Sequence, residues 1–548
     1  MAQFINAKED IVTQAIDGLL AASGGRLTRL DGYPYVKVVT RTEIDRSKVA
    51  LISGGGSGHE PAHAGFVGEG MLTAAVCGDV FASPSVEAVL AGILAVTGEA
   101  GCLLIVKNYT GDRLNFGLAA ERARAFGHRV EMVVVSDDVA LPDLAQPRGV
   151  AGTLFVHKAA GAVAEAGGSL DEVAAMARSV IEDVMSICMS LDTCSVPGSP
   201  KEERIPEGRA ELGLGIHGEA GAEQVPFEGA RGAVAAMIGK LEPLMKEGPY
   251  VALVNNLGGT SELEMAIVTE ELRRSAIGER IASIVGPASV MTSLDMHGLS
   301  ISLLPAREEV VDLLGRPASQ TAWPGLNAFG AGEAVPMPDG LRPIRHTPSA
   351  SPETERFLRL CCEVLIDAED DLNALDAKSG DGDTGTTLAT AARGLLDAMS
   401  DLPLADHTQL LRAIGQELSQ TMGGSSGVLL AIFFAAAGEG AASGHTLPEA
   451  FARGLDRMGE IGGAGPGDRT MIDALGPALA ALQDGPDAAA AAARDGAERT
   501  ARMTRAAAGR AAYIGADQLA GHADPGAEAV ARLFEGIAAG GREGRMAG

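Results

Sequence analysis

The feature that most constrains the fold is an alternation of short apolar runs with longer helix-like stretches over residues 1–320. The runs read as buried strands: Val49–Ile52, Thr73–Val76, Leu103–Val106, Glu131–Val135, Val251–Val254 and Ser300–Leu304. The stretches between them read as helices, such as Ser85–Ala95, Phe116–Phe126 and Leu170–Met189. Strands that alternate with helices are typical of α/β domains. We therefore predict an α/β domain over 1–320, built from two subdomains that meet near Cys194–Gly198.

The pattern changes after a segment, 316–352, that is rich in proline and glycine and has no apolar period. Such composition indicates a linker, which we place at 321–352. From Glu353 onward apolar residues recur at helical spacing, and the helix-like segments lie near 385–399, 408–420, 427–437 and 470–482. An alanine-rich stretch over 486–513 also favours helix. We predict that 353–548 is an all-helical bundle.

Charge and composition exclude several classes of partner. The net charge of −28 argues against a nucleic-acid backbone or an anionic membrane. The longest apolar run, Val428–Ala437, is too short to cross a bilayer. Six cysteines occur without a CxxC pair, and the N-terminus lacks a signal-peptide pattern. We expect a soluble cytoplasmic protein that binds neither nucleic acid nor membrane.

One loop near the start of the helical part concentrates acidic residues. Leu375–Leu388 reads LDAKSGDGDTGTTL and carries Asp376, Asp381 and Asp383. Carboxylates so close repel one another, and a magnesium ion removes that cost because it prefers hard oxygen ligands. The threonines that follow offer donors to a phosphate at the start of a helix. An EF-hand is excluded by the wrong residues at its fifth and twelfth positions, whereas a solvated acidic turn stays open as an alternative.

The first domain carries a glycine loop and two charged residues at strand ends. The segment LISGGGSGHEPAHA is a buried strand followed by a glycine-rich loop. The loop lacks the glycine spacing of a Rossmann fingerprint, and no P-loop sequence occurs in the chain. His59 in this loop is either a ligand-facing acid/base or a histidine that caps the turn. Lys107 and Asp112 in VKNYTGDRLN lie where α/β proteins bind ligands, although a surface ion pair is the commoner fate of such residues.

A second histidine has an unusual setting. His217 lies in ELGLGIHGEAG, between glycines and just after the strand-like LGLGI. The literal GxGxxG here does not open a helix, so we discount dinucleotide binding. A histidine with so little to pack against favours a reactive imidazole, which is a competent nucleophile toward a carbonyl carbon.

Glycine-rich connections in the second domain are less specific. Met422–Gly427 reads MGGSSG, a GxSxG that follows a helix rather than a strand, so phosphate contacts suit it better than a serine nucleophile. Gly462–Met471 and Gly521–Gly526 either line a nucleotide or form ordinary turns. Arg510 is a candidate phosphate contact, with a solvated arginine as the alternative.

Together these segments resemble the ATP-dependent dihydroxyacetone kinases in which both domains are fused, over nearly the whole chain. The resemblance rests on GGGSGHEPAHAGFVG, KNYTGDRLNFG, GLGIHGEAG, NNLGGTSELE, GDGDTGTT and GGSSG, in this order. It implies an α/β substrate domain, an eight-helix nucleotide domain and a homodimer. It also implies ATP and two magnesium ions as cofactors, and dihydroxyacetone as the phosphate acceptor, with glyceraldehyde as a candidate second acceptor.

The resemblance also implies roles for individual residues. His217 would hold the ketone as a covalent hemiaminal, and His59 and Asp112 would be the acid/base candidates. The substrate pocket would be formed by Gly56, Ser57, Gly58, His59, Lys107, Asp112 and His217. The magnesium ligands would be Asp376, Asp381 and Asp383. The nucleotide contacts would be Thr384, Gly385, Thr386, Thr387, Ser425, Ser426, Gly462, Thr470, Met471, Arg510, Asp524, Pro525 and Gly526.

Three alternatives to this assignment stay open. A kinase of a related ketose such as erythrulose would use the same histidine. A non-catalytic regulator would keep the sugar-binding fold, although the retained His217 and the three aspartates speak against it. A lyase that acts on FAD is a known side activity among relatives of this family.

Overall fold

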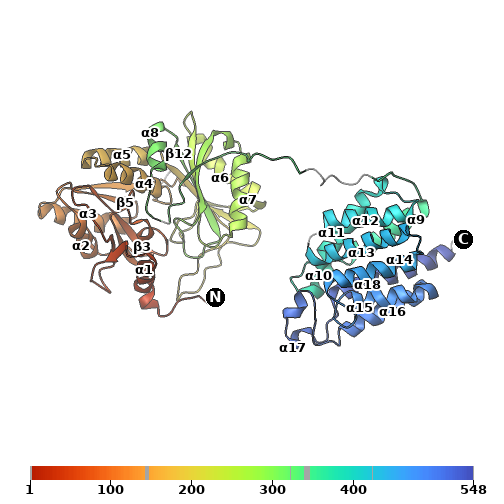
Figure 1. The fold of residues 1–548 in the computed structure, drawn as a ribbon. Coiled ribbons are helices and arrows are strands. Elements are labelled where there is room, and N and C mark those ends of the chain that lie inside the picture. Colours follow the sequence, from red (N-terminus) through yellow and green to blue (C-terminus); the bar gives the residue numbers. More distant parts are fainter. Residues whose placement is uncertain (1–2, 142–146, 321, 339–345, 423, 547–548) are drawn as a thin grey trace. The chain divides into compact units, whose positions relative to one another are not determined.

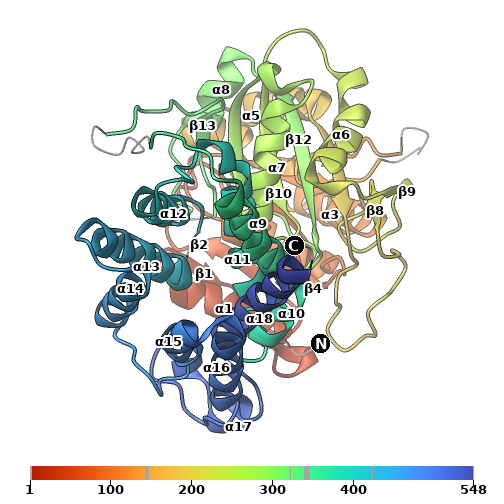
Figure 2. The same ribbon diagram turned by 90° about the vertical axis from the view of Figure 1, so that its right-hand side faces the viewer.

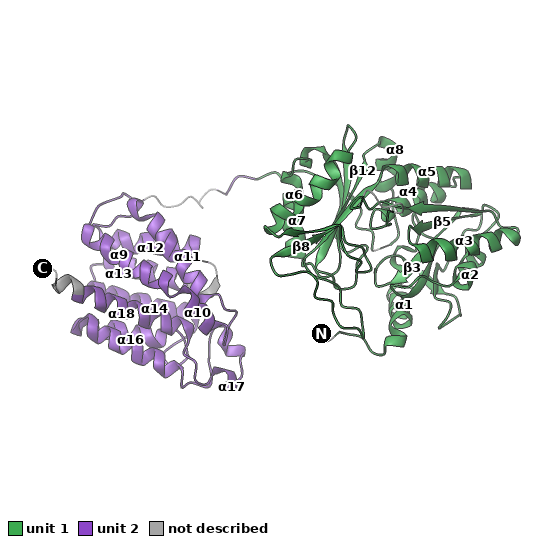
Figure 3. Ribbon diagram, turned by 180° about the vertical axis from the view of Figure 1, so that it is seen from behind, with its two compact units in different colours: residues 1–334 green, residues 335–548 purple. Residues whose placement is uncertain are grey.

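The computed structural model describes residues 3–141, 147–320, 322–338, 346–422 and 424–546, without the side chains of 424–426 and 543–546. The chain forms two compact units, Met1–Ala334 and Val335–Gly548 (Figure 3). The first unit is α/β and the second is helical, so the predicted fold class is confirmed. Within the described ranges, no helix is both long and apolar enough to cross a membrane.

The first sheet of the α/β unit has the strand order β1-β2-β4-β3-β5-β6, in which β4, β3, β5 and β6 run parallel. Figure 1 labels two of its strands, β3 and β5. Its strands are β1 (Leu27–Arg29), β2 (Val38–Arg41), β3 (Ala50–Ser57), β4 (Ala74–Val80), β5 (Cys102–Lys107) and β6 (Val130–Val135). Side chains alternate between its faces: Leu51 packs toward one hydrophobic core, and Ile52 packs toward another. Two helices, α2 (Val86–Val96) and α3 (Thr110–Ala125), cover the Ile52 face.

The second sheet has the order β13-β11-β10-β12-β7-β8-β9. Its strands are β7 (Met185–Ser190), β8 (Arg209–Leu212), β9 (Glu223–Pro226), β10 (Tyr250–Asn256), β11 (Ile281–Ala288), β12 (Gly298–Pro305) and β13 (Leu326–Ala328). One face is covered by α6 (Gly229–Leu241) and α7 (Glu262–Arg274). The other face shares a core with the Leu51 face of the first sheet. Helices α1 (Ile11–Ala22), α4 (Thr153–Glu165), α5 (Leu170–Asp183) and α8 (Glu308–Gly315) also contribute to that core.

The structure corrects the predicted helix at Leu170–Met189. The helix α5 begins as expected, with Ser169 and Glu172 in a reciprocal capping box, but it ends at Asp183. The next residues form β7, in which every side chain is buried. A short apolar run fits a buried strand as well as a helix, which explains the error. Because β7 belongs to the second sheet, the chain enters the second subdomain at Met185, before the predicted Cys194–Gly198.

The second unit is a helical bundle in which α15, α16 and α18 contact one another and lie side by side in Figure 2. Its helices are α9 (Pro352–Asp367), α10 (Glu369–Asp376), α11 (Thr384–Asp397), α12 (His407–Thr421), α13 (Gly424–Ala442), α14 (Leu447–Gly462), α15 (Ile472–Ala481), α16 (Pro486–Thr500), α17 (Ala516–Leu519) and α18 (Pro525–Met546). The predicted helices near 385–399, 408–420, 427–437 and 470–482 correspond to α11, α12, α13 and α15.

Two features of the bundle departed from the sequence pattern. The alanine-rich helix stops at Thr500, whose hydroxyl donates to the Ala497 carbonyl and accepts from the Asp524 amide, so 501–513 is mostly irregular. The final helix α18 was not among the segments predicted as helical, and it contains several glycines. A Cβ on Gly536 would lie 2.5 Å from the Val364 side chain, so the missing side chain lets α18 approach α9 closely.

Candidate active site

The carboxyl ends of β3 and β5 lie side by side because the two strands are parallel neighbours. This edge carries the glycine loop at the end of β3, Lys107 at the end of β5 and Asp112 in the first turn of α3. Gly56 is required by close packing, since a Cβ there would lie 2.7 Å from the Ala82 amide nitrogen. The Ser57 hydroxyl donates to the Gly78 carbonyl at 2.9 Å, so it braces the loop.

His59 is completely buried, and its ring has a defined tautomer. Its Nδ1 lies 2.8 Å from the Thr292 carbonyl oxygen. Because a carbonyl only accepts hydrogen bonds, Nδ1 carries the proton, and Nε2 of the neutral ring carries the lone pair. Nε2 has no hydrogen-bond partner among the described residues. Burial, with Lys107 nearby, lowers the pKa of His59 well below its usual value, so the ring is neutral.

Lys107 and Asp112 are also buried, at 0% and 3% exposure. Lys107 Nζ and Asp112 Oδ1 lack hydrogen-bond partners within the described part of the chain. A Cβ on Gly55 would lie 3.6 Å from Lys107 Nζ and 3.5 Å from Asp112 Oδ2, so both charged groups reach the same side of β3. Burial lowers the pKa of Lys107, and the charge of Asp112 opposes that shift. Buried polar atoms without partners are costly, which points to a polar ligand between them.

His217 lies beyond the end of β8, on a loop rather than on the strand-like continuation expected for LGLGI. Ile216 anchors the loop in the core, and the Ser293 hydroxyl donates to its carbonyl at 2.6 Å. The His217 ring centroid is 4.8 Å from that of His59 and 4.5 Å from that of Tyr109. Its side chain keeps 17% exposure, so it is accessible. The structure thus brings His217 together with His59 from a distant part of the sequence.

Glu219 folds back onto His217. Its Oε2 accepts the His217 backbone N–H at 2.9 Å, and its Oε1 lies 3.1 Å from His217 Nδ1. Gly215 makes room for this turn, because a Cβ there would lie 2.0 Å from Glu219 Oε2. Burial alone would raise the pKa of Glu219, but the hydrogen bonds and charge of His217 outweigh it and hold the pKa at about 2. Glu219 is therefore a carboxylate at neutral pH.

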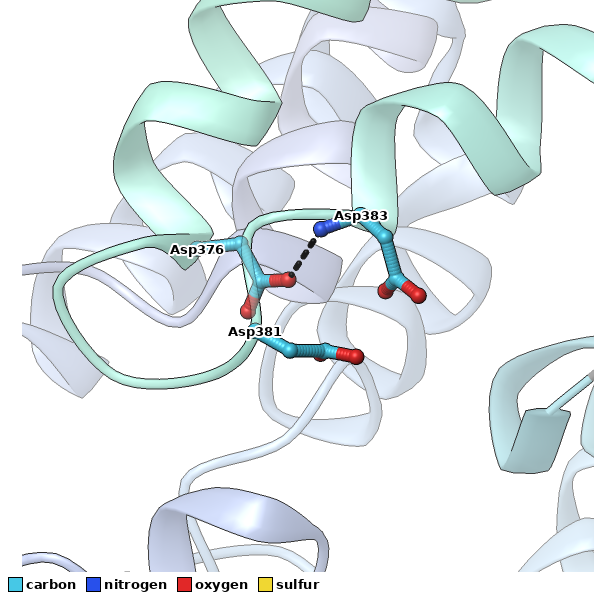
Figure 4. A group of neighbouring side chains, drawn as sticks. All are labelled: Asp376, Asp381 and Asp383. Atoms are coloured by element: carbon cyan, nitrogen blue, oxygen red, sulfur yellow. Dashed lines mark hydrogen bonds between the residues drawn. The ribbon is translucent and has the colours of Figure 1, made fainter. Parts of the chain in front are cut away.

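In the helical unit, the three predicted metal ligands converge. Asp376, Asp381 and Asp383 each offer an oxygen within 4.8 Å of the others (Figure 4). Asp376 Oδ2 accepts the N–H groups of Gly382, Asp383 and Thr384 at 3.0–3.2 Å, so it holds the loop and leaves Oδ1 available. Burial and the neighbouring Asp381 raise the pKa of Asp383, which reflects accumulated negative charge. A donor set made only of carboxylate oxygens fits a magnesium ion.

The predicted nucleotide residues that follow the acidic loop form the first turn of α11. The Thr386 amide and hydroxyl are both engaged by Asn373, at 3.0 and 2.9 Å. Gly385 is a packing residue, since a Cβ there would lie 2.0 Å from the Glu369 carbonyl. The Thr387 amide donates to the Asp383 carbonyl at 2.9 Å. Ser425 and Ser426 belong to the first turn of α13, where the side chains lie outside the described residues.

The remaining predicted contacts lie on two loops that meet. Thr470 and Met471 precede α15, and Asp524 caps α18 by accepting the Ala527 amide at 2.9 Å. A Cβ on Gly526 would lie 3.3 Å from Met471 Cβ, so these loops touch. Burial raises the pKa of Asp524 to about 6. Pro525 opens α18, and Gly462 closes α14 against Leu429.

Arg510 pairs with one of the carboxylates. It lies in a short 3₁₀ turn, and its guanidinium forms an ion pair with Asp381. The structure therefore places a predicted phosphate contact directly beside a predicted metal ligand.

Several residues around these sites were missed by reasoning from sequence. Tyr109, Phe81, Thr292 and Glu219 surround the two histidines, and Arg469 is buried behind Thr470. Glu219 lies in GLGIHGEAG and Tyr109 lies in KNYTGD. Because these motifs also contain His217 and Lys107, the nearness of Glu219 and Tyr109 in the sequence could have marked them as site residues. Thr292 and Phe81 come from other segments, and no local pattern marks them. In the segment VNNLGGTSELE, Asn255 Oδ1 accepts the Val290 and Met291 amides beside Thr292, so this segment holds the neighbouring loop in place.

Comparison with known proteins agrees with this two-part arrangement. Residues 17–322 match the Dak1 domain, and residues 378–539 match the DAK2 domain. The chain is 47% identical over 543 residues to the dihydroxyacetone kinase of Citrobacter freundii, covering 98% of each chain. It is 40% identical over 504 residues to the human triokinase/FMN cyclase, covering 86% of each.

Solved structures give the same result. The crystal structure of the C. freundii dihydroxyacetone kinase in its native form superposes with a TM-score of 0.69 at 46% identity, over 98% of this chain and 100% of that one. A structure of the same kinase in complex with AMP-PNP and Mg²⁺ matches with a TM-score of 0.69 at 45% identity, over 98% and 99%. The chain therefore belongs to the dihydroxyacetone kinase family, in its fused form with a Dak1 and a DAK2 domain.

Proposed function

We propose that this protein transfers the γ-phosphoryl group of ATP to dihydroxyacetone and forms dihydroxyacetone phosphate. The observation that carries the proposal is the set of buried polar atoms without partners that surround His217 among the described residues. These atoms are His59 Nε2, Lys107 Nζ, Tyr109 Oη and Asp112 Oδ1. A small polyhydroxy ketone offers the hydroxyl and carbonyl groups that such atoms need. The Citrobacter freundii relative, which matches over 98% of each chain, is a dihydroxyacetone kinase, and this supports the same substrate.

His217 would select the substrate by reactivity. Attack of its imidazole on the carbonyl carbon gives a hemiaminal, which glycerol cannot form because it has no carbonyl. His59 or Asp112 would then accept the proton of the terminal hydroxyl as that oxygen attacks phosphorus. The bare Nε2 of a neutral His59 suits a base better than an acid.

Magnesium and ATP would be held by the helical unit. Asp376, Asp381 and Asp383 would bind the metal, for which we propose two ions. These ions would neutralise the negative charge that develops on the triphosphate during phosphoryl transfer. The first turn of α11 and the loops at 470–471 and 524–526 would line the nucleotide, with Arg510 released from Asp381 to contact phosphate. The support for this assignment is the relative whose structure contains AMP-PNP and Mg²⁺.

The test is ADP release measured across dihydroxyacetone, glyceraldehyde, erythrulose and glycerol. We expect dihydroxyacetone to be preferred over glycerol, and we expect His217→Ala to remove that preference while the fold, followed by circular dichroism, is retained. A wild-type protein that binds the sugar but consumes no ATP would contradict the kinase assignment and favour a regulator.

A kinase of a related ketose is the second candidate. The observation in its favour is that the part-buried but accessible imidazole of His217 would capture any small ketone. One relative, from tomato, is named a putative 3,4-dihydroxy-2-butanone kinase. A higher kcat/KM for erythrulose than for dihydroxyacetone in the same assay would support this candidate.

We also propose that the protein is a cytoplasmic homodimer whose two functional units are joined by a linker. The linker is shorter than the predicted 321–352, because Trp323 and β13 belong to the α/β unit. The six cysteines are all free, which suits a reducing compartment. Light scattering of the purified full-length chain tests the dimer, and a monomeric mass would refute it.

A further inference from the structure

The two histidines at the substrate site are held in the same way. Each ring has its Nδ1 occupied: His59 by the Thr292 carbonyl at 2.8 Å and His217 by the Glu219 carboxylate at 3.1 Å. Each ring therefore has Nε2 as the atom left for chemistry. In His59 the partner is a backbone group that no substitution changes. In His217 the partner is a side chain, so its contribution can be tested.

We propose that Glu219 is a positioning residue that sets the tautomer of His217, with the proton on Nδ1 and the lone pair on Nε2. An ionised carboxylate only accepts hydrogen bonds, so a ring nitrogen that faces it must carry a proton. The proposal rests on the proposed capture of a ketone by His217, because only the bare nitrogen attacks a carbonyl carbon.

Three observations support the role of Glu219 as a fixed, ionised hydrogen-bond acceptor beside His217. The carboxylate takes two N–H groups of one residue, the backbone amide and Nδ1 of His217, so the ring orientation and the loop are held together. Gly215 leaves the space that Oε2 occupies, and any Cβ there would collide with it. The low pKa of Glu219 keeps it ionised, and so an acceptor, at neutral pH.

The carboxylate would also stabilise the product of capture. The Nε2 lone pair forms the N–C bond, the carbonyl π pair moves onto oxygen, and that oxygen takes a proton from solvent. The ring then carries a positive charge with its proton still on Nδ1. Glu219 balances this charge without taking the proton, because its pKa is far below that of an imidazolium.

The decisive variants are Glu219→Gln and Glu219→Ala. In Glu219→Gln the amide oxygen keeps the backbone N–H, and the amide NH₂ donates to Nδ1, which moves the ring proton to Nε2. We expect covalent capture to fall on the order of 10²–10⁴-fold, the scale of a wrong tautomer in a catalytic triad. In Glu219→Ala the ring exchanges freely between tautomers, so we expect a smaller loss, on the order of tenfold, the scale of one lost charged hydrogen bond. A residue with a purely structural role gives the opposite order, because glutamine matches the shape of glutamate.

Two readouts are needed on the full-length protein. Long-range ¹H–¹⁵N spectra of histidine-labelled protein without sugar report the tautomer of His217, assigned by its absence in His217→Ala. The ¹³C resonance of [2-¹³C]dihydroxyacetone reports capture, because the carbonyl signal is lost when the hemiaminal forms. Glu264→Gln is the matched control, since Glu264 also pairs with a histidine, His297, at 2.8 Å.

The outcomes separate the proposal from the function on which it rests. An Nδ1–H ring in the wild type that becomes Nε2–H in Glu219→Gln supports the proposal, and so does a greater loss of capture in glutamine than in alanine. An Nε2–H ring in the wild type, or equal capture by both variants and the wild type, overturns it. If the wild type forms no hemiaminal, the proposed capture fails, and the tautomer spectra still decide the role of Glu219.

Discussion

The acidic loop predicts a contrast between two isosteric substitutions, Asp376→Asn and Asp381→Asn. Asp376 Oδ2 accepts three backbone N–H groups, whereas Asp381 is more exposed and pairs with Arg510. Both changes remove a candidate metal ligand, so we expect both to abolish ATP turnover. Only the first should weaken the fold.

The magnitude follows from the hydrogen bonds. A bond to a charged acceptor contributes about 1 kcal/mol more than a bond to a neutral one, so three bonds amount to about 3 kcal/mol. Removal of one of three like charges returns about 1 kcal/mol at these separations in water. Asp376→Asn should therefore destabilise the helical unit by about 2 kcal/mol without metal. Asp381→Asn should not destabilise the unit, because the same relief of repulsion, about 1 kcal/mol, offsets the loss of its exposed ion pair with Arg510, which contributes less than about 1 kcal/mol.

The assay is urea unfolding of the full-length chain in chelator, followed by two signals. Trp323 is the single tryptophan of the chain and is buried in the α/β unit, so its fluorescence reports that unit. Far-UV circular dichroism reports the helices of both units. We expect Asp376→Asn to shift only the transition seen by circular dichroism. Equal destabilisation by both variants, or a shift in the fluorescence transition, would refute the assigned role of Asp376.

The remaining predictions concern the turn before Glu219, the metal and the pH. Gly215→Ala should reduce capture of [2-¹³C]dihydroxyacetone about as much as Glu219→Ala, because its Cβ would lie 2.0 Å from Glu219 Oε2; unchanged capture would contradict this. Chelation of divalent cations should abolish ADP release and leave sugar binding, measured by calorimetry, unaffected. Stability of the α/β unit should fall as pH drops below about 6.5, because burial lowers the pKa of three of its histidines and the unfolded chain binds protons that the folded unit does not. These histidines are His59, His63 and His157. Burial raises the pKa of Asp137 to about 6, so below pH 6 the folded unit binds one proton that the unfolded chain does not, and this offsets one of the three histidine protons. Burial also raises the pKa of Glu60 and Asp138, which offsets part of the remaining difference in bound protons, so the sign of the slope is the prediction. A flat or rising stability in Trp323-monitored unfolding between pH 6.5 and 5 would exclude it.

Much of the fold could be predicted because its signals are local. Buried parallel strands are continuous apolar runs, and amphipathic helices repeat their apolar residues, so β3, β5, α11 and α12 were recognisable. The errors occurred where local patterns are ambiguous. The run at Met185–Ser190 satisfies a strand or a helix, and its choice depends on β12 and β8, which pair with it from more distant segments. The glycines of α18 look unfavourable until α9 is placed against them.

For the candidate site, too, some properties follow from local sequence and others depend on the tertiary structure. The sequence by itself determined which reactive groups the chain carries: an imidazole between glycines, a lysine and an aspartate at a strand end, and three aspartates in one loop. Only the tertiary structure decided the state of those groups. Thr292 assigns the proton of His59 from 233 residues away, and burial by surrounding segments lowers the pKa of both His59 and Lys107. Hydrogen-bond partners and desolvation depend on which segments meet in space, and local residue patterns do not encode that meeting.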